Sequence, residues 1–267
     1  MPIYVDAEIQ VFSEPEFHSL AERVVGIAFD VHQSFGRLLD EEVYKNVISG
    51  RCHAAGIVPV RREVEIVVQH DDFRKSYFMD SLLANGLMVE AKVVEELADV
   101  HRAQAIHYLL LTGMHHGLLL NFRPGKVEKW FVSTSLDLNE RRRFEIDDSD
   151  WQPRTVASRK LRRLVEDLLL DWGAFLQTSL YRQAITHFFG GPEIALRRVP
   201  VYDAGRQVGT HEVCMLEEGT AVAVTGLSSG QPAMADHLRR FLWHTDLTTV
   251  DWVNLDKHQI TFRTITR

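Results

Sequence analysis

The chain has 267 residues, enough for one large domain or two domains of medium size. Its hydrophobic content of 45% and charged content of 25% are ordinary for a globular protein, and no apolar run approaches the roughly 20 residues of a membrane span. The first 150 residues carry 16 basic and 25 acidic side chains (net −9), and the remainder carries 14 and 12 (net +2). Neither part is the strongly basic surface of a tight nucleic-acid binder, so any grip on phosphate must be local or depend on a metal or a partner.

The N-terminal residues do not resemble a signal peptide, because they have no basic start and no apolar core. Cys52 and Cys214 are far apart and show no metal-type spacing. We therefore expect a cytoplasmic protein with no membrane association.

Two helices are predicted first. Apolar residues recur with a period near 3.6 in residues 18–35, which indicates an amphipathic helix that ends at Gly36. A second helix is predicted over residues 40–49, where Glu41, Tyr44 and Lys45 share one face. Residues 57–69 are rich in Val and Ile and predict the first strand of a sheet.

Residues 79–92 predict a β-hairpin that carries charge in an apolar setting. Asn85-Gly86 is the expected turn, with positive φ at both residues. Asp80 lies on the first strand, and Glu90 and Lys92 project from the same face of the second strand, because residues i and i+2 do so. Charges in such a position are costly unless they pair or bind a metal.

The charged hairpin suits metal-assisted phosphodiester hydrolysis. Mg²⁺ prefers hard oxygen ligands and usually takes one or two carboxylates, with water and substrate oxygens completing its shell. Asp80, Glu90 and the backbone carbonyl of Ala91 are the candidate ligands for Mg²⁺ or Mn²⁺, and Lys92 would lie beside the attacking water. On spacing alone, the alternative is a buried ion pair in an ordinary sheet.

A third helix is predicted over residues 99–113, with Asp99 as its N-cap and Gly113 as its stop. Gln104 and Tyr108 share one face of this helix, and His101 lies one turn earlier. Residues 118–120 then predict a buried strand, and residues 126–133 predict an edge strand.

The pattern Asp-x9-Glu-x-Lys across a hairpin resembles the PD-(D/E)xK nuclease superfamily, and the surrounding sequence resembles its GxxExxY branch. The resemblance covers about residues 15–135, although Gly36 lies five residues before Glu41 rather than three, so only the Glu-x-x-Tyr half is in register. The matching segments are residues 36–44 (GRLLDEEVY), 90–97 (EAKVVEEL), 101–104 (HRAQ), 111–113 (LTG) and 117–122 (GLLLNF).

The resemblance implies an α/β fold, a restriction-endonuclease-like mixed sheet flanked by helices, in a metal-dependent nuclease that acts on DNA or RNA. It implies that Glu41 is an outer metal-water ligand or general base, and that Gln104 orients the water or a phosphate oxygen. Four further residues would contact substrate: Tyr44, His101, Arg102 and Tyr108. Without the resemblance, Glu41 would be a solvated helical residue beside an aromatic core residue.

A domain boundary is predicted in the charged stretch 138–158. This stretch contains Arg141-Arg142-Arg143, which could contact phosphate, but a solvated linker is the simpler interpretation. The predicted domains are therefore residues 1–137, with the intact motif, and residues 159–267.

The second domain resembles a degenerate copy of the first, which would make the chain a tandem duplicate. Residues 173–185 align without a gap over residues 36–48, with Gly, Leu, Tyr and Ile in common. Further on, a constant offset of 133 places Gly219, Phe241 and Asn254 over Gly86, Tyr108 and Asn121. Chance similarity between two small α/β domains is the alternative.

The second copy lacks the charged groups of the first. The aligned residues are Thr178 for Glu41, Val213 for Asp80, Ala223 for Glu90, Thr225 for Lys92 and His237 for Gln104. A one-residue slip would bring Glu212 to the position of Asp80, but nothing replaces Lys92. We therefore expect a catalytically silent domain, in either a monomer with an internal pseudo-dimer or a homodimer.

Three functions follow from the sequence. The first is a metal-dependent nuclease with Asp80, Glu90, Lys92, Glu41 and Gln104 as its site. The second is a non-catalytic nucleic-acid-binding or scaffold protein that retains the fold, which the acidic charge balance favours. The third is a phosphoesterase that acts on nucleotides or nucleic-acid ends and needs no broad basic surface.

Overall fold

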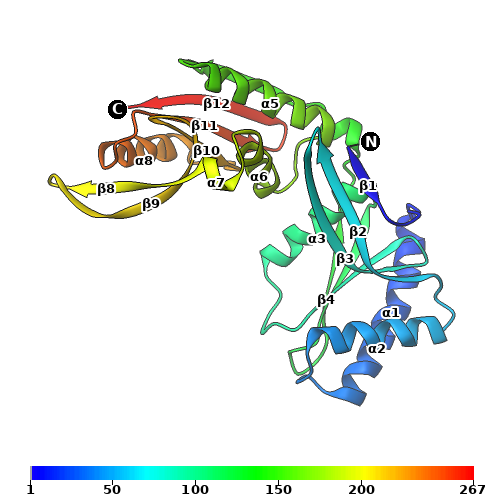
Figure 1. Cartoon of the computed structure of the whole chain (residues 1–267). Coiled ribbons are helices and arrows are strands. Elements are labelled where there is room, and N and C mark those ends of the chain that lie inside the picture. The colour runs from blue at the N-terminus through cyan, green and yellow to red at the C-terminus, as the bar shows by residue number, and fades with distance from the viewer. Residues whose placement is uncertain (1) are drawn as a thin grey trace. The chain divides into compact units, whose positions relative to one another are not determined.

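The computed structural model describes residues 2–267, which form two compact units. Unit 1 comprises the chain up to Gln69 together with Arg74–Leu138, and unit 2 comprises His70–Phe73 and Asn139–Arg267. Each unit is a six-stranded mixed sheet flanked by helices, consistent with a restriction-endonuclease-like fold in two sheet units (Figure 1). Within the described residues, no helix combines the length and the apolar character needed to cross a membrane.

The strands of unit 1 follow chain order across the sheet, and the β4–β5 pair is parallel, whereas β1–β2, β3–β4 and β5–β6 are antiparallel. The elements are β1 (Ile3–Val5), α1 (Glu14–Phe35), α2 (Glu41–Ala54), β2 (Val60–His70), β3 (Phe73–Leu83), β4 (Leu87–Lys92), α3 (Asp99–Thr112), β5 (His116–Asn121) and β6 (Glu128–Ser133). All the predicted helices and strands of this part exist, with boundaries shifted by up to six residues.

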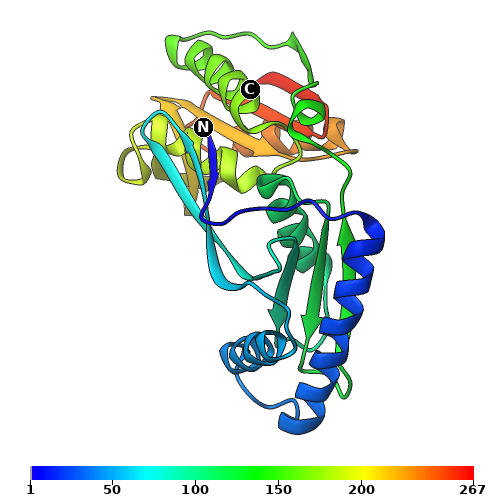
Figure 2. The ribbon, with the colours of Figure 1, turned by 90° about the vertical axis from the view of Figure 1, so that its right-hand side faces the viewer.

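The main core of unit 1 lies between α1, α2 and one face of the sheet. Helix α1 runs along the sheet (Figure 2) and buries residues such as Phe17 and Val24, which belong to the same cluster as Val89 and Leu118. Since side chains alternate along a strand, Glu90 projects from the face opposite Val89. The apolar pattern of β4 therefore fixes the direction in which the charged side chains point.

The β3–β4 hairpin forms where it was predicted, but its turn differs from the expected one. Positive φ angles occur at Ala84 (49°) and Asn85 (56°), and Gly86 does not have one. Gly86 is required for a different reason, because a Cβ at this position would lie 2.5 Å from ring atoms of Phe12. The glycine thus provides space for an aromatic side chain rather than conformational freedom.

Unit 2 contains a sheet whose neighbours are β7-β12-β11-β10-β9-β8. Its elements are α4 (Leu138–Arg141, which begins at the last residue of unit 1), β7 (Glu145–Asp150), α5 (Val156–Trp172), α6 (Thr178–Phe188), α7 (Pro192–Ala195), β8 (Leu196–Asp203), β9 (Arg206–Glu217), β10 (Thr220–Thr225), α8 (Gln231–Trp243), β11 (Thr249–Asp256) and β12 (Gln259–Thr266).

The predicted linker at residues 138–158 is wrong, because much of this stretch belongs to the second unit. Strand β7 pairs in parallel with β12 at the edge of the sheet. Arg141 is also not a free phosphate contact, since only 1% of it is exposed and its guanidinium donates a hydrogen bond to the carbonyl of Trp172 at 2.9 Å. An edge strand pairs through its backbone and leaves charged side chains in solvent, so its composition resembles that of a linker.

Five strands have the same order in both sheets. Strands β2-β3-β4-β5-β6 of unit 1 and β8-β9-β10-β11-β12 of unit 2 are neighbours in chain order. The third and fourth strands of each set are parallel, and the fourth and fifth are antiparallel. The sixth strand differs, since β1 pairs with β2 whereas β7 pairs with β12.

Two internal hydrogen-bond patterns also occur in both units. The side chain of Asn121 bonds the backbone N–H and carbonyl of Val94 at 3.1 and 2.8 Å. The side chain of Asn254 bonds the same two groups of Leu227 at 2.8 and 2.9 Å, and both residues lie 133 positions later. In each unit, a buried asparagine amide thus fixes the loop that follows a strand, β4 in unit 1 and β10 in unit 2.

The hydroxyl of Tyr44 donates a hydrogen bond to the carbonyl of Gly36 at 2.7 Å, and the hydroxyl of Tyr181 donates one to the carbonyl of Gly173. Tyr44 has no exposed surface, and its ring stacks on Phe122 with 4.6 Å between ring centroids. The predicted contact of Tyr44 with substrate is therefore wrong. A tyrosine at this helical position holds the preceding turn and packs in the core.

Candidate active site

Asp80 and Glu90 lie where strands β3 and β4 separate. The strands pair through Ser81–Val89, Leu82–Met88 and Leu83–Leu87, and the next position along each strand is occupied by one of the two acids. The backbone N–H of Asp80 donates to Oε1 of Glu90, and the backbone N–H of Ala91 donates to Oδ2 of Asp80, both at 3.0 Å. Each carboxylate thus bonds the opposite strand and keeps its second oxygen for other partners.

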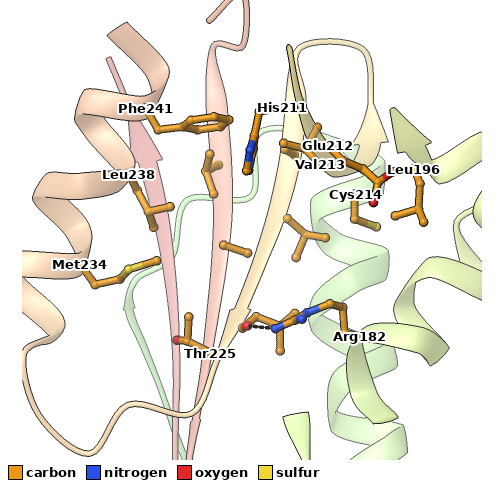
Figure 3. A pocket seen from close by; sticks show the side chains of 15 residues that line it. Arg182, Leu196, His211, Glu212, Val213, Cys214, Thr225, Met234, Leu238 and Phe241 are labelled. Carbon is orange, nitrogen blue, oxygen red and sulfur yellow. Dashed lines mark hydrogen bonds between the residues drawn. The ribbon is translucent and has the colours of Figure 1, made fainter. Parts of the chain in front are cut away.

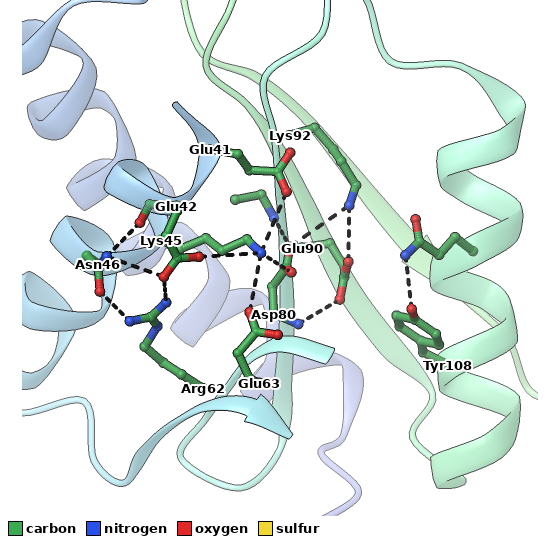
Figure 4. A network of polar contacts seen from close by, with 12 residues as sticks. Glu41, Glu42, Lys45, Asn46, Arg62, Glu63, Asp80, Glu90, Lys92 and Tyr108 are labelled. Carbon is green, nitrogen blue, oxygen red and sulfur yellow. Dashed lines mark hydrogen bonds and ion pairs between the residues drawn. The ribbon is translucent and has the colours of Figure 1, made fainter. Parts of the chain in front are cut away.

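Lys92 holds the free oxygen of Glu90. Its Nζ lies 3.4 Å from Oε2 of Glu90 and 3.9 Å from Oδ2 of Asp80. The side chain of Glu90 is 1% exposed and that of Lys92 is 13% exposed. The structure therefore brings together the three side chains that the hairpin pattern singled out, in a largely buried group (Figure 4).

A second lysine, which the sequence analysis did not include in the site, completes the cluster. Nζ of Lys45 lies 2.7 Å from Oδ1 of Asp80, 3.3 Å from Oε1 of Glu63 and 3.6 Å from Oε1 of Glu41. A fourth carboxylate, that of Glu42, lies 4.0 Å away. The i, i+4 spacing of Glu41 and Lys45 on α2 was the available signal, but their partners come from β2 and β3.

Glu63 has an unusual backbone conformation at this site. Its φ is 48°, in the left-handed region that residues other than glycine rarely adopt. The side chain nevertheless reaches the ammonium of Lys45, together with an acid from each of two other elements. Such outliers often occur at functional sites, where surrounding contacts hold them in place.

The charges of the cluster perturb one another. Burial, followed by the nearby charge of Asp80, raises the pKa of Glu90 far above its usual range, and Lys92 only partly offsets this effect. Burial acts to lower the pKa of Lys92 and of Lys45, but adjacent carboxylates outweigh it and raise both values. At Glu90, therefore, the positive charge of Lys92 does not fully compensate for burial and for the charge of Asp80.

The predicted residues on α3 lie beside the cluster without bonding to it. The amide of Gln104 donates to the hydroxyl of Tyr108 at 3.0 Å, and within the described chain no hydrogen bond joins Gln104 to the acids. Burial raises the pKa of Tyr108, which is close enough for the charges of Glu90 and Lys92 to act on it. Gln104 is thus near the site but bound to a neighbour.

The start of α3 also differs from expectation. Its N-cap is Ala98 rather than Asp99, and the backbone N–H of Ala98 donates to Nδ1 of His101 at 2.9 Å. One ring nitrogen of His101, a predicted substrate contact, thus stabilises the start of the helix. Arg102 is exposed on the same turn and is free of such a role in the described structure.

The donor set suits a hard divalent cation. Two carboxylates face each other across the β3–β4 opening, and their excess negative charge is the condition that a cation would relieve. Among the described residues, no group of three or more His, Cys, Asp or Glu side chains is arranged to hold a metal. A cation here would therefore take few protein ligands and complete its shell with water and substrate oxygens, as Mg²⁺ commonly does.

The mixed sheet with flanking helices is consistent with a restriction-endonuclease-like fold. Residues 18–131, somewhat less than half of the chain, match the sequence model of the PD-(D/E)XK nuclease superfamily. The matched segment contains every residue of the charged cluster. No curated protein matches the chain.

One similar solved structure is titled "Crystal structure of SSO0001". The sequence identity is 13% and the TM-score is 0.29, over 65% of this chain and 78% of that chain. A likeness of this size supports no conclusion about fold or function.

Proposed function

We propose that unit 1 is a divalent-metal-dependent nuclease that hydrolyses nucleic-acid phosphodiester bonds. The observation that carries this proposal is the buried Asp80–Glu90–Lys92 group at the β3–β4 opening, inside the segment that matches a nuclease superfamily. An ordinary structural ion pair would need one acid and one base. Two mutually repelling carboxylates with only partial compensation are better suited to binding a cation.

In this proposal Asp80, Glu90 and the carbonyl of Ala91 hold Mg²⁺ or Mn²⁺. When bound, the cation would lower the pKa of a coordinated water and polarise the phosphate. The ammonium of Lys92, fixed by Glu90, holds the attacking water by a hydrogen bond and places positive charge near the attacked phosphate. Glu41 completes the acidic rim and accepts a proton from outer water.

Substrate contacts are assigned to the side of α3. Gln104 would exchange its bond with Tyr108 for one to a water or phosphate oxygen, and Tyr108 would then offer its hydroxyl to substrate. Arg102, which is exposed, would contact the phosphate backbone, and His101 would do so only by releasing the N–H of Ala98. The acidic balance of this part of the chain makes such local contacts necessary.

We further propose that unit 2 is a degenerate copy of unit 1. The shared order of five strands, the two asparagine patterns and the two tyrosine bonds support a duplication rather than a chance likeness. The pair Cys214–Val222 lies 133 positions after Ser81–Val89, which keeps Val213 in register with Asp80. Glu212 is exposed and does not replace the lost acid.

The test is cleavage of mixed DNA and RNA substrates with Mg²⁺ or Mn²⁺. We expect metal-dependent cleavage by the wild type and its loss in Asp80→Ala and Lys92→Ala, because each change removes a partner from the buried group. Asp30→Ala and Lys126→Ala, at exposed positions, are matched controls that should cleave normally.

The alternatives are distinguished by substrate and by metal binding. No cleavage together with no Mn²⁺ binding in calorimetry would refute the nuclease proposal and favour a non-catalytic nucleic-acid-binding protein. Cleavage limited to nucleotides or strand ends would favour a phosphoesterase. Protein concentration dependence of sedimentation would separate a monomer with an internal pseudo-dimer from a homodimer.

A further inference from the structure

Unit 2 contains a pocket where unit 1 has its charged cluster. Strands β9 and β10 pair only through Cys214–Val222, Met215–Ala221 and Glu217–Thr220, and the opening beyond these pairs is a cavity of about 420 Å³ (Figure 3). This volume lies in the range of small-molecule sites. In unit 1 the corresponding opening is occupied by two acids and two lysines.

The walls of the pocket are mostly apolar. Val213 and Ala223 line it from the sheet, and Met234 and Phe241 line it from α8. At one end the ring of Phe241 meets that of His211 edge to face, with 5.4 Å between centroids. Apolar walls that end in an aromatic ring favour a ligand with a flat, apolar body, such as a nucleobase.

A guanidinium group supplies positive charge to the pocket. Arg182, on α6, donates from Nη2 to the carbonyl of Val224 at 3.0 Å, which fixes the orientation of its fork. In the described part of the chain no carboxylate forms an ion pair with Arg182, so its remaining N–H groups are available to an anion. Glu212 also lines the pocket, but Figure 3 shows it displaced from Arg182, toward the end with His211.

The combination selects among anionic ligands. A phosphate or carboxylate matches the guanidinium fork, and bonds to charged groups are the strong ones. A nucleobase can also donate N–H groups to the carboxylate of Glu212 at the other end of the pocket, which an aliphatic acid cannot do. At the β3–β4 opening of unit 1, the carboxylates of Asp80 and Glu90 would repel an anion. At the β9–β10 opening of unit 2, the corresponding residues are Val213 and Ala223, which carry no charge.

We propose that the unit 2 pocket binds a nucleoside phosphate without cleaving it, with the base against Phe241 and the phosphate on Arg182. The source is either a free nucleotide or a nucleotide of a single strand, since both present the same chemistry. This inference concerns unit 2 and does not require cleavage by unit 1.

The experiment is calorimetric titration of the full chain in EDTA with adenosine monophosphate, adenosine and a short oligothymidylate. Arg182→Gln removes the phosphate partner, and Ala223→Phe fills the pocket. Arg206→Gln changes the same charge at an exposed site at the start of β9 and is the matched control. Thermal unfolding of each variant verifies that it is folded, and Arg182 is itself exposed, so its loss leaves the core intact.

We expect the monophosphate or the oligonucleotide to bind the wild type and the control alike. Arg182→Gln should weaken binding by about tenfold or more, the usual cost of a lost charged hydrogen bond, and Ala223→Phe should abolish it. Binding of the oligonucleotide alone would identify a strand as the source.

Three outcomes would overturn the proposal. These are no binding of either phosphate ligand, binding of adenosine as tight as that of its monophosphate, and binding that neither pocket variant changes. Metal-dependent cleavage is measured separately. A chain that binds nucleotide but does not cleave would refute only the proposed nuclease function, and the reverse result would refute only this inference.

Discussion

Lys45 should act as an internal cation that holds the acidic cluster together when no metal is bound. Its side chain is 12% exposed, and its ammonium lies within 4.0 Å of four carboxylates, of which Asp80 is the closest at 2.7 Å. Replacing Lys45 with Met keeps most of the volume and removes the charge. We therefore expect Lys45→Met to destabilise unit 1 in metal-free buffer.

The size of the effect follows from burial. Removing one partner of a buried ion pair costs about 3–5 kcal/mol. Only Asp80, at 9% exposure, is a buried partner, while the side chains of Glu63 and Glu42 are 50% and 59% exposed and contribute little. We expect a loss of roughly 2–4 kcal/mol in the free energy of unfolding, measured by urea denaturation in EDTA.

A divalent cation should reverse the effect. In the wild type the ammonium lies against Asp80 and repels an incoming cation, whereas the variant offers the same carboxylates without this competitor. Mn²⁺ should therefore bind Lys45→Met at least about tenfold more tightly than the wild type in calorimetry. It should also restore much of the lost stability, since binding to the folded state stabilises it.

The controls separate charge from packing. Lys45→Arg keeps the charge and should stay close to the wild type in metal-free stability, and Lys126→Met, at an exposed site, should change neither quantity. Equal stability of Lys45→Met and the wild type without metal would show that Lys45 does not hold the cluster. An unchanged Mn²⁺ affinity would show that the ammonium does not occupy space that the cation needs.

Two further predictions concern buried polar groups. Burial raises the pKa of Asp251 to about 6 from an ordinary 3.8, although hydrogen bonds from Ser158 and Thr264 act against this rise. The folded state therefore retains the proton through this window, and stability falls as the pH rises from about 4 to 6. Asp251→Asn should therefore be more stable than the wild type at pH 8, by up to roughly 3 kcal/mol, and equal to it near pH 4. Urea denaturation at several pH values tests this, and a stability difference that does not change with pH would contradict it. Asn121→Ala and Asn254→Ala each leave two loop backbone groups unbonded and should each lower stability by about 2–4 kcal/mol. Hydrogen exchange should show lost protection only in the unit that carries the change, and lost protection in both units would refute independent loops.

The charged hairpin could be read from the sequence because its information is local. Asp80, Glu90 and Lys92 lie on consecutive strands, and strand alternation alone fixes which side chains share a face. The partner that the sequence did not reveal, Glu63, comes from another strand and approaches Lys45 through a backbone conformation that its residue type does not indicate. The closest ion pair of the cluster, Lys45–Asp80, likewise joins a helix to a strand.

The errors have a common physical origin. The resemblance predicts that Tyr44 contacts substrate, yet its hydroxyl bonds a backbone carbonyl and its ring stacks on Phe122. The charged composition of residues 145–150 predicts a linker, yet these residues form strand β7, because an edge strand needs only backbone partners on one side. In both cases the tertiary partner decided the outcome, and it lay outside the local pattern.

The two units treat the same structural opening in opposite ways. Where two antiparallel strands separate, unpaired backbone groups must be satisfied, and unit 1 does this with the carboxylates of Asp80 and Glu90. The cost is mutual repulsion between the acids, which Lys92 only partly offsets at Glu90. Unit 2 avoids that repulsion with Val213 and Ala223, and Arg182 bonds a carbonyl of β10 instead. If unit 2 is the degenerate copy proposed above, replacement of the two acids would leave space at its opening and Arg182 as the charged group. The proposed loss of metal binding and the proposed anion-binding pocket would then have one structural cause.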